Sequence, residues 1–255
     1  MSALAKPPTA RAGSGLALLA FVTALALLLA PVVRASARRS AKVTYVAGAA
    51  TSQAGGRGAK TTLKQGSRVF EHDLVETAAG ARVELETADG SVVRVGPQSR
   101  LLLQSAYFGA SGVKRFSAKL FFGRVWTKVS GLVGGDSKFE VQTDNAVAGV
   151  RGTTFRVDAR RDHSVILRVY AGSVAMASTG VVQKHLPTTG GRRTQIQGPS
   201  RISAREWEKL VGNMMQLAVN ADGTAGDPTP FTAKDDAGDD WAAWNLMMDA
   251  RESGH

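Results

Sequence analysis

The chain of 255 residues contains no cysteine, which excludes disulfide bonds, thiolate nucleophiles and cysteine-based metal sites. Histidine is scarce as well, and no spacing typical of zinc ligands occurs among the four, which are His72, His163, His185 and His255. The phosphate-binding pattern G-x-x-x-x-G-K-[S/T] is also missing. The sequence therefore predicts no metal, no cofactor and no enzyme activity.

Two short pairs nevertheless combine the residue types of acid–base catalysis. His72 precedes Asp73, and a neighbouring carboxylate can orient an imidazole. Asp162 precedes His163, but this pair falls in an expected hairpin turn, where we expect it to be exposed. The two glutamates of residues 84–86 lie on the polar face of an expected strand, which is the usual place for carboxylates. None of these groups predicts a catalytic site.

No charged residue occurs between Gly15 and Val33, and this apolar run follows a stretch that carries Lys6 and Arg11. Such an order predicts export or membrane insertion. The run is close to the ~20 residues that span a bilayer, whereas the small residues 35–37 resemble a signal-peptidase site. Residues 1–37 are therefore predicted to be either a cleaved signal peptide or a retained transmembrane signal anchor. Either way, we expect the rest of the chain to be periplasmic or extracytoplasmic, and the anchor would hold it in the inner membrane by one N-terminal helix.

Acidic residues are few along most of the chain and then become frequent near its end. Residues 38–219 hold 27 lysines and arginines against 13 aspartates and glutamates, whereas residues 220–255 hold 2 against 8, and the net charge is +11. A basic protein often binds nucleic acid, but export argues against that partner. Lipid headgroups, lipopolysaccharide or cell-wall polymer remain as polyanionic partners, and a solvated basic surface without a specific partner is the other interpretation.

Helical periodicity is missing from residues 42–200, where short runs of Val, Leu, Phe and Thr alternate with glycine-containing turns. This spacing favours a mainly β domain. The clearest hairpin is the stretch ARVELETADGSVVRVG, in which Val83, Leu85 and Thr87 share one face. The pair Asp89–Gly90 predicts a two-residue type I′ turn.

The pattern then recurs within the same domain. DGSVVRV (89–95) and RGTTFRV (151–157) share the form x-G-[S/T]-x-x-R-V, and VETAAGARV (75–83) is echoed by VQTDNAVAGV (141–150). LFFGRVW (120–126) is likewise echoed by VYAGSVA (169–175). A unit of about 60 residues cannot bury its apolar face alone, so we expect two β-units to stack as a β-roll or short solenoid.

The first motif pair also suggests a site. In the second copy, Arg151 replaces Asp89, which turns an acidic turn into a basic one. The default interpretation of the repeat is structural, with Gly152 relieving the backbone of the turn. The exchange makes Arg151 the position that we most expect to have a function, and the candidate binding residues of this copy are Arg151, Gly152, Thr153, Thr154 and Arg156.

The sequence after residue 200 predicts three further segments. In residues 203–219 an apolar stripe, with a capping-box pattern at Ser203 and Glu206, predicts an amphipathic helix docked on the β-domain. Residues 220–238, rich in Asp, Gly, Pro, Thr and Ala, predict a flexible acidic linker. Residues 239–251 predict a short helix with one apolar face that comprises Trp241, Trp244, Met247 and Met248.

The terminal helix has two interpretations. A short apolar face after a flexible linker is the form of a ligand that docks into a partner's groove. The alternative is that the segment folds back on its own domain, and the acidic linker would support this by lying against the basic body.

The order of these motifs resembles the FecR domain, the extracytoplasmic module of iron-transport sigma regulators and of many standalone envelope proteins. The resemblance covers residues 65–180 and rests most on V-R-G-T-x-F-x-V, which begins at Val150. It implies an all-β periplasmic domain that takes part in protein contacts and transmits a signal across the envelope. A full regulator of that family also carries a cytoplasmic anti-sigma domain, whereas only residues 1–14 precede the apolar run here. We therefore expect no direct regulation of a sigma factor.

We thus expect a non-catalytic envelope protein that acts in protein–protein interaction or signal transmission with an unidentified envelope protein. The alternative function is binding of cell-wall or another anionic polymer through a basic β-surface, for which the candidate arginines are Arg151, Arg156, Arg160, Arg161, Arg192 and Arg193.

Overall fold

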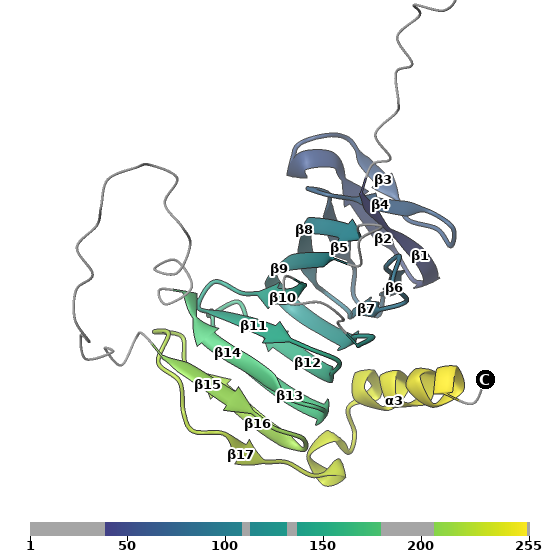
Figure 1. Cartoon of the computed structure of the whole chain (residues 1–255). Coiled ribbons are helices and arrows are strands. Elements are labelled where there is room, and N and C mark those ends of the chain that lie inside the picture. The colour runs from purple at the N-terminus through teal and green to yellow at the C-terminus, as the bar shows by residue number, and fades with distance from the viewer. Residues whose placement is uncertain (1–38, 109–112, 132–136, 180–206, 254–255) are drawn as a thin grey trace, which may run out of the picture. The chain divides into compact units, whose positions relative to one another are not determined.

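The computed structural model describes residues 39–108, 113–131, 137–179 and 207–253, which belong to the compact unit Arg38–His255 (Figure 1). The predicted signal or anchor segment, residues 1–37, lies outside the described residues. Among the residues that are described, no helix is long and apolar enough to cross a membrane. The described chain is mainly β with one C-terminal α-helix, as the alternating pattern predicts. The solenoid arrangement stays a prediction.

The first of two sheets, called sheet A here, is antiparallel throughout. Its strands follow one another in the order β4 (Arg68–Phe70), β1 (Ser40–Ala47), β6 (Arg82–Glu86), β7 (Val92–Val95), β9 (Lys114–Lys128), β12 (Thr154–Ala159), β13 (Val165–Ala171), β16 (Met215–Val219) and β17 (Thr229–Pro230).

The second, called sheet B, is antiparallel except for the parallel pair of β9 with β10. Its order is β3 (Lys60–Thr62), β2 (Ala50–Gln53), β5 (Leu74–Thr77), β8 (Arg100–Phe108), β9, β10 (Lys138–Gln142), β11 (Ala146–Val150), β14 (Val174–Ser178) and β15 (Glu208–Val211). A one-turn 3₁₀ helix, η1 (Ala54–Gly56), follows β2.

Strand β9 belongs to both sheets. Up to Phe122 it pairs with β8 and β10 of sheet B, and from Gly123 onward it pairs with β7 and β12 of sheet A. Gly123 has a φ of 105°, in the region that favours glycine. A Cβ atom placed there would lie 2.4 Å from the Cα of Ser99. The bend that joins the two sheets therefore requires glycine at this position.

One hydrophobic cluster contains buried side chains from both sheets, including Val125 and Phe155 of sheet A and Leu101 of sheet B. In sheet B, Phe116 and Phe139 are register partners across the parallel pair, and their rings stack with centroids 4.3 Å apart. Strand β13 buries alternate residues, as expected from the period of two in the sequence, whereas β12 buries Phe155, Arg156 and Val157 in succession.

The two x-G-[S/T]-x-x-R-V copies occupy equivalent positions on either side of β9. Val92 of the first copy and Thr154 of the second both pair with Lys128, and Arg94 and Arg156 both pair with Trp126. The repeat in the sequence thus places two arginines symmetrically about one tryptophan.

The turn before β7 differs from the predicted type I′ turn. Only Gly90 has positive φ, at 78°, and Asp89 does not. The Gly90 N–H donates to the Thr87 carbonyl, and the Thr87 N–H donates to the Ser91 carbonyl. Asp89 instead accepts hydrogen bonds from the hydroxyls of Thr87 and Ser91, which fixes the turn in another conformation.

The predicted helix over residues 203–219 is wrong in its described part, which forms β15 and β16. The helical stripe is split, because Trp207 and Val211 are buried while Leu210 is 70% exposed. Strand β15 pairs with β14, and β16 pairs with β13, so the free edges of both sheets gain backbone hydrogen bonds that a helix would not have supplied. Residues 203–206 lie outside the described residues.

The predicted flexible linker over residues 220–238 is also wrong, because this segment is built into the fold. It contains β17 and the 3₁₀ helix η2 (Ala233–Asp236). The Thr232 hydroxyl and backbone N–H both donate to the Asp235 carboxylate and cap η2. A C-terminal helix then follows, α3 (Asp240–Ser253), which the sequence predicts at residues 239–251.

Candidate protein-binding surface on sheet A

A row of large polar and aromatic side chains crosses the outer face of sheet A. Side chains alternate along a strand, so residues paired across neighbouring strands point to the same face. Consecutive register partners form the row, which we call the arginine row: Tyr45, Glu84, Arg94, Trp126, Arg156, Arg168 and Gln216.

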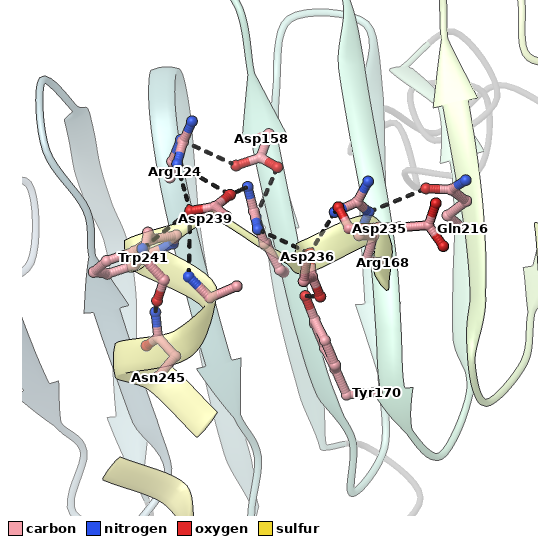
Figure 2. A network of polar contacts seen from close by, with 12 residues as sticks. Arg124, Asp158, Arg168, Tyr170, Gln216, Asp235, Asp236, Asp239, Trp241 and Asn245 are labelled. Atoms are coloured by element: carbon pink, nitrogen blue, oxygen red, sulfur yellow. Dashed lines mark hydrogen bonds and ion pairs between the residues drawn. The ribbon is translucent and has the colours of Figure 1, made fainter. Parts of the chain in front are cut away.

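The centre of the arginine row is buried although it lies on the side of the sheet away from the core. Arg94 and Trp126 are 0% exposed, and Arg156 is 3% exposed. The C-terminal segment from Phe231 to Ser253, which contains η2 and α3 and is called the tail here, covers them. Figure 2 shows the tail residues Asp236 and Asp239 among the arginines of the sheet.

Asp239 joins the start of α3 to the sheet. Its carboxylate accepts hydrogen bonds from the backbone N–H groups of Trp241, at 3.0 Å, and Ala242, at 3.4 Å, as an N-cap residue does. The same carboxylate accepts from Arg156 Nη2 at 2.7 Å and from Arg124 Nη1 at 3.1 Å (Figure 2). One side chain therefore both begins the helix and holds it on the arginine row.

Farther along α3, Arg94 forms the second anchor. Its Nε donates to Glu84 of the sheet at 2.6 Å, and its Nη1 donates to Asp249 of α3 at 2.6 Å, while Nη2 pairs with Glu252. The indole Nε1 of Trp126 donates to the other oxygen of Asp249 at 2.9 Å. Such charge-assisted bonds to one guanidinium fix its direction as well as its charge.

Asp236 of η2 forms the third anchor. Its carboxylate accepts from Arg168 and, at 2.7 Å, from the hydroxyl of Tyr170. The Tyr170 ring lies 4.2 Å from the Trp126 ring, centroid to centroid. Burial raises the pKa of the Tyr170 hydroxyl, and the Asp236 carboxylate raises it further, so this hydroxyl stays a hydrogen-bond donor at neutral pH.

Burial and charge act in opposite directions on the ionised groups of this surface. Burial alone would lower the pKa of the Arg156 guanidinium, but Asp158 and Asp239 raise it above its ordinary value. Burial raises the pKa of the Asp158 carboxyl by more than Arg156 and Arg124 lower it. Burial would also raise the pKa of the Asp239 carboxyl, but Arg156 and Arg124 lower it below its ordinary value. The charge of the Asp239 carboxylate therefore favours docking of the tail.

We expect acid to release the start of the tail. Because the pKa of Asp239 is lowered, its contribution is complete above its ordinary value of 3.8 and is lost as the pH falls through the lowered pKa. The raised pKa of Asp158 acts in the opposite sense, which is why a variant is needed. Tryptophan fluorescence should therefore shift to the red as the pH falls below about 3.8.

The variant Asp239→Asn should already show the shifted emission at neutral pH, with a smaller change on acidification. Asp240→Asn is the matched control, because Asp240 is the exposed neighbouring carboxylate. Identical pH curves for Asp239→Asn and the wild type would show that Asp239 does not hold the tail.

Of the binding residues predicted in the second repeat, only Arg156 belongs to the arginine row. Arg151 and Gly152 form an exposed turn between β11 and β12, Thr153 is buried, and Thr154 pairs with Lys128 in the sheet. Arg151 borders a separate hollow of about 360 Å³ on sheet B, beside Leu210. The functional role predicted for Arg151 stays a prediction.

The residues predicted on the terminal helix divide between two faces. Trp241 is 2% exposed and lies against Gly96, and Trp244 packs with its ring centroid 5.4 Å from that of Tyr45. Met248 is half-buried, whereas Met247 is 42% exposed. In this structure the helix folds back on its own domain, which is the second of the two interpretations of the sequence.

Among the arginines considered for polymer binding, Arg160 and Arg161 are exposed, and Arg192 and Arg193 lie outside the described residues. The sequence interpretation missed Arg94, Glu84 and Trp126. The signal was present, because the repeat contains one arginine in both copies, Arg94 and Arg156. The interpretation concentrated on Arg151, where the copies differ, and did not connect Arg156 with its counterpart Arg94 in the first copy.

Comparison with known proteins gives a family match for the middle of the chain. Residues 73–175 match the family model described as FecR protein. Two crystal structures of a candidate anti-sigma factor from Parabacteroides distasonis ATCC 8503 are similar to the chain at 16% sequence identity, with TM-scores of 0.44 and 0.45. In both cases the similarity covers 63% of this chain and 61% of the other, so the chain spans less than two thirds of that protein. No curated protein matches the sequence.

Proposed function

We propose that this chain, whose residues 73–175 are a FecR domain, is a non-catalytic signalling protein of the cell envelope that acts by binding another protein. The arginine row on sheet A is its binding surface. The apolar run of residues 15–33 would direct the domain out of the cytoplasm.

One observation carries this proposal: Arg94, Trp126 and Arg156 lie side by side in register and are already engaged by a peptide segment. Arginine, tryptophan and tyrosine are the residues that contribute most binding energy at protein interfaces. Their positions are fixed by the β-ladder, so the surface is organised before any partner arrives, which lowers the entropic cost of binding.

An anionic polymer fits this surface less well than a protein. Each guanidinium of the arginine row is paired with carboxylates. Arg156, for example, contacts three of them, Asp158, Asp236 and Asp239. A polymer phosphate or carboxylate would have to replace these partners next to Asp158, which stays on the sheet. A protein segment can supply hydrogen-bond donors and acceptors together, and thus satisfy both signs of charge.

Site-specific photo-crosslinking in intact cells tests the proposal. A photoreactive residue at Gln216, at the rim of the arginine row, should give one crosslinked envelope protein, whereas the same residue at Thr61 of β3 should not. Arg168→Gln should weaken this crosslink by about tenfold, since a charged hydrogen bond contributes roughly 1.5–3 kcal/mol. Arg115→Gln, an exposed arginine on β9 in sheet B, is the matched control. Equal crosslinking from Gln216 and Thr61, or none from either, would refute the proposal.

A further inference from the structure

Helix α3 packs on the sheet through tryptophans near its start and, farther along, through polar side chains. Asn245 is 0% exposed, and Asp249 and Glu252 bind Arg94. The outward side carries Leu246 at 46% and Met247 at 42% exposure, together with the exposed alanines Ala243 and Ala250. A surface helix normally buries its apolar stripe. Besides the apolar contacts of Trp241, Ala242, Trp244 and the half-buried Met248, α3 is therefore held by ion pairs and hydrogen bonds.

Buried ion pairs and hydrogen bonds contribute more to the specificity of binding than to its affinity. Buried ion pairs must be dehydrated, and this cost cancels much of the attraction between the charges. Removing one partner alone leaves a buried charge uncompensated, which is strongly unfavourable. A segment that presents the same carboxylates could therefore exchange with the tail, whereas departure of the tail without a replacement is disfavoured.

The surface beneath the tail specifies what the replacement must carry. Arg156 requires a carboxylate that also caps a helix, which Asp239 supplies in this chain. The surface at Gly96 accepts an aromatic ring, because the Trp241 ring lies against it. Arg94 and the Trp126 indole require a second carboxylate between them, which Asp249 supplies ten positions after Asp239. The occupant is thus an acidic helix with a tryptophan in its first turn.

We propose that the arginine row is a receptor site for an acidic, tryptophan-containing helix of a partner protein, and that the chain's own tail occupies this site as an internal competitor. This inference rests on the proposed function and adds the chemistry of the partner and the way in which access is controlled. The acidic charge of residues 220–255 against the basic body matches this arrangement.

The covalent connection sets how strongly the tail competes. A tethered ligand acts at a local concentration on the order of millimolar. A partner helix must displace the tethered tail in order to bind. Substitutions that weaken binding of the tail should therefore raise the apparent affinity for the partner, although the arginine row itself is unchanged. The covalent link between the tail and the sheet runs through β17. The tail can therefore leave the arginine row while β16 and β17 stay paired.

The test uses the full chain and a fluorescent peptide of residues 231–253. The variant Asp239→Asn/Asp249→Asn weakens the tail at two anchors and leaves every residue of the arginine row intact. We expect the peptide to bind this variant at least about tenfold more tightly than the wild-type chain, measured by fluorescence anisotropy. Asp227→Asn/Asp240→Asn removes the same charge from exposed positions and should bind the peptide as the wild type does.

A second peptide separates specific recognition from attraction of opposite charges. This peptide carries Asn in place of both Asp239 and Asp249. We expect it to bind the Asp239→Asn/Asp249→Asn chain no more tightly than it binds the wild-type chain. Equal affinity of the wild type and this variant for the native peptide, or equal binding of the two peptides, would overturn the inference. The crosslink from Gln216 could still be found in that case, so failure of the inference is distinguishable from failure of the proposed function.

Hydrogen exchange in the wild-type chain provides a measurement that needs no variant. If the tail leaves the sheet without unfolding of the domain, the amide hydrogens of α3 exchange faster than amides that exchange only on global unfolding. We expect the α3 amides to exchange at least about tenfold faster than those of β9 and β12. Exchange of α3 only together with these strands would show that the tail is a permanent part of the fold and would overturn the inference.

Discussion

Replacing Arg94 with methionine should destabilise the protein by about 3–5 kcal/mol, because it removes a buried guanidinium that pairs with three carboxylates. Arg94 is completely buried and pairs with Glu84, Asp249 and Glu252. The side chain of Glu84 is 9% exposed and would remain on the sheet without its charged partner. The Asp249 side chain is 16% exposed and can return fully to water only if α3 leaves the sheet, whereas Glu252 is 32% exposed and also pairs with Lys128. The variant should therefore lose both stability and the docked tail.

Urea unfolding measures the first loss, and limited proteolysis of the tail measures the second. The matched control is Arg100→Met, because Arg100 is 44% exposed and lies 3.5 Å from its partner Glu76. Exposed pairs of this kind contribute about 0–1 kcal/mol. If Arg94→Met cost no more than Arg100→Met, the ion pairs of Arg94 could not be what holds α3.

A double variant distinguishes loss of attraction from exposure of an unpaired charge. Arg94→Met/Glu84→Met removes both members of the pair on the sheet, and apolar groups of similar size can replace a buried ion pair at little cost. We expect the double variant to recover part of the stability that Arg94→Met loses. Its tail should nevertheless stay sensitive to protease, since Asp249 and Glu252 have both lost their ion pair with the guanidinium of residue 94.

The β class and the repeat were predictable from the sequence because both depend on local patterns. Alternation of apolar and polar residues sets the faces of a strand, and glycines mark the turns between strands. The two x-G-[S/T]-x-x-R-V copies occupy equivalent places beside β9 for the same reason: identical patterns form identical pairings. The resemblance to FecR, carried by these motifs, agrees with the family match over residues 73–175.

The segment at residues 203–219 shows where local patterns fail. Trp207, Leu210 and Val211 have the spacing of a helical stripe, yet they lie in or beside a strand. The deciding factor is outside the segment, because β13 and β14 offer sheet edges that need partners. Propensity is a weak prior that tertiary contacts override.

The arginine row could not be predicted for a similar reason. Arg94 and Asp249 are 155 residues apart, and no local pattern joins them. The separation of charge between the basic body and the acidic end suggested that the two could meet. Their register could not be inferred, since it depends on which strands flank Trp126.

Gly123→Ala should destabilise the protein by about 4 kcal/mol or more, because both the backbone and the neighbouring strand exclude a side chain there. At a φ of 105° the backbone of an alanine is strained, and its Cβ would lie 2.4 Å from Ser99 Cα. This Cα is a backbone atom, so rotation of a side chain cannot relieve the clash. Trp126 lies three residues beyond this bend, so any shift of β9 also displaces the centre of the arginine row.

Thermal and urea unfolding of Gly123→Ala, with Gly212→Ala as the control, measure this effect. No atom lies within 4 Å of a Cβ placed at Gly212, and its φ lies outside the left-handed region, so we expect a change below about 0.5 kcal/mol there. Wild-type stability of Gly123→Ala would mean that β9 does not pass from one sheet to the other at this residue. A large loss of stability, together with earlier cleavage of the tail by protease, would instead connect the bend to the arginine row. The glycine that joins the two sheets would then also set the position of Trp126, which pairs with both arginines of the repeat.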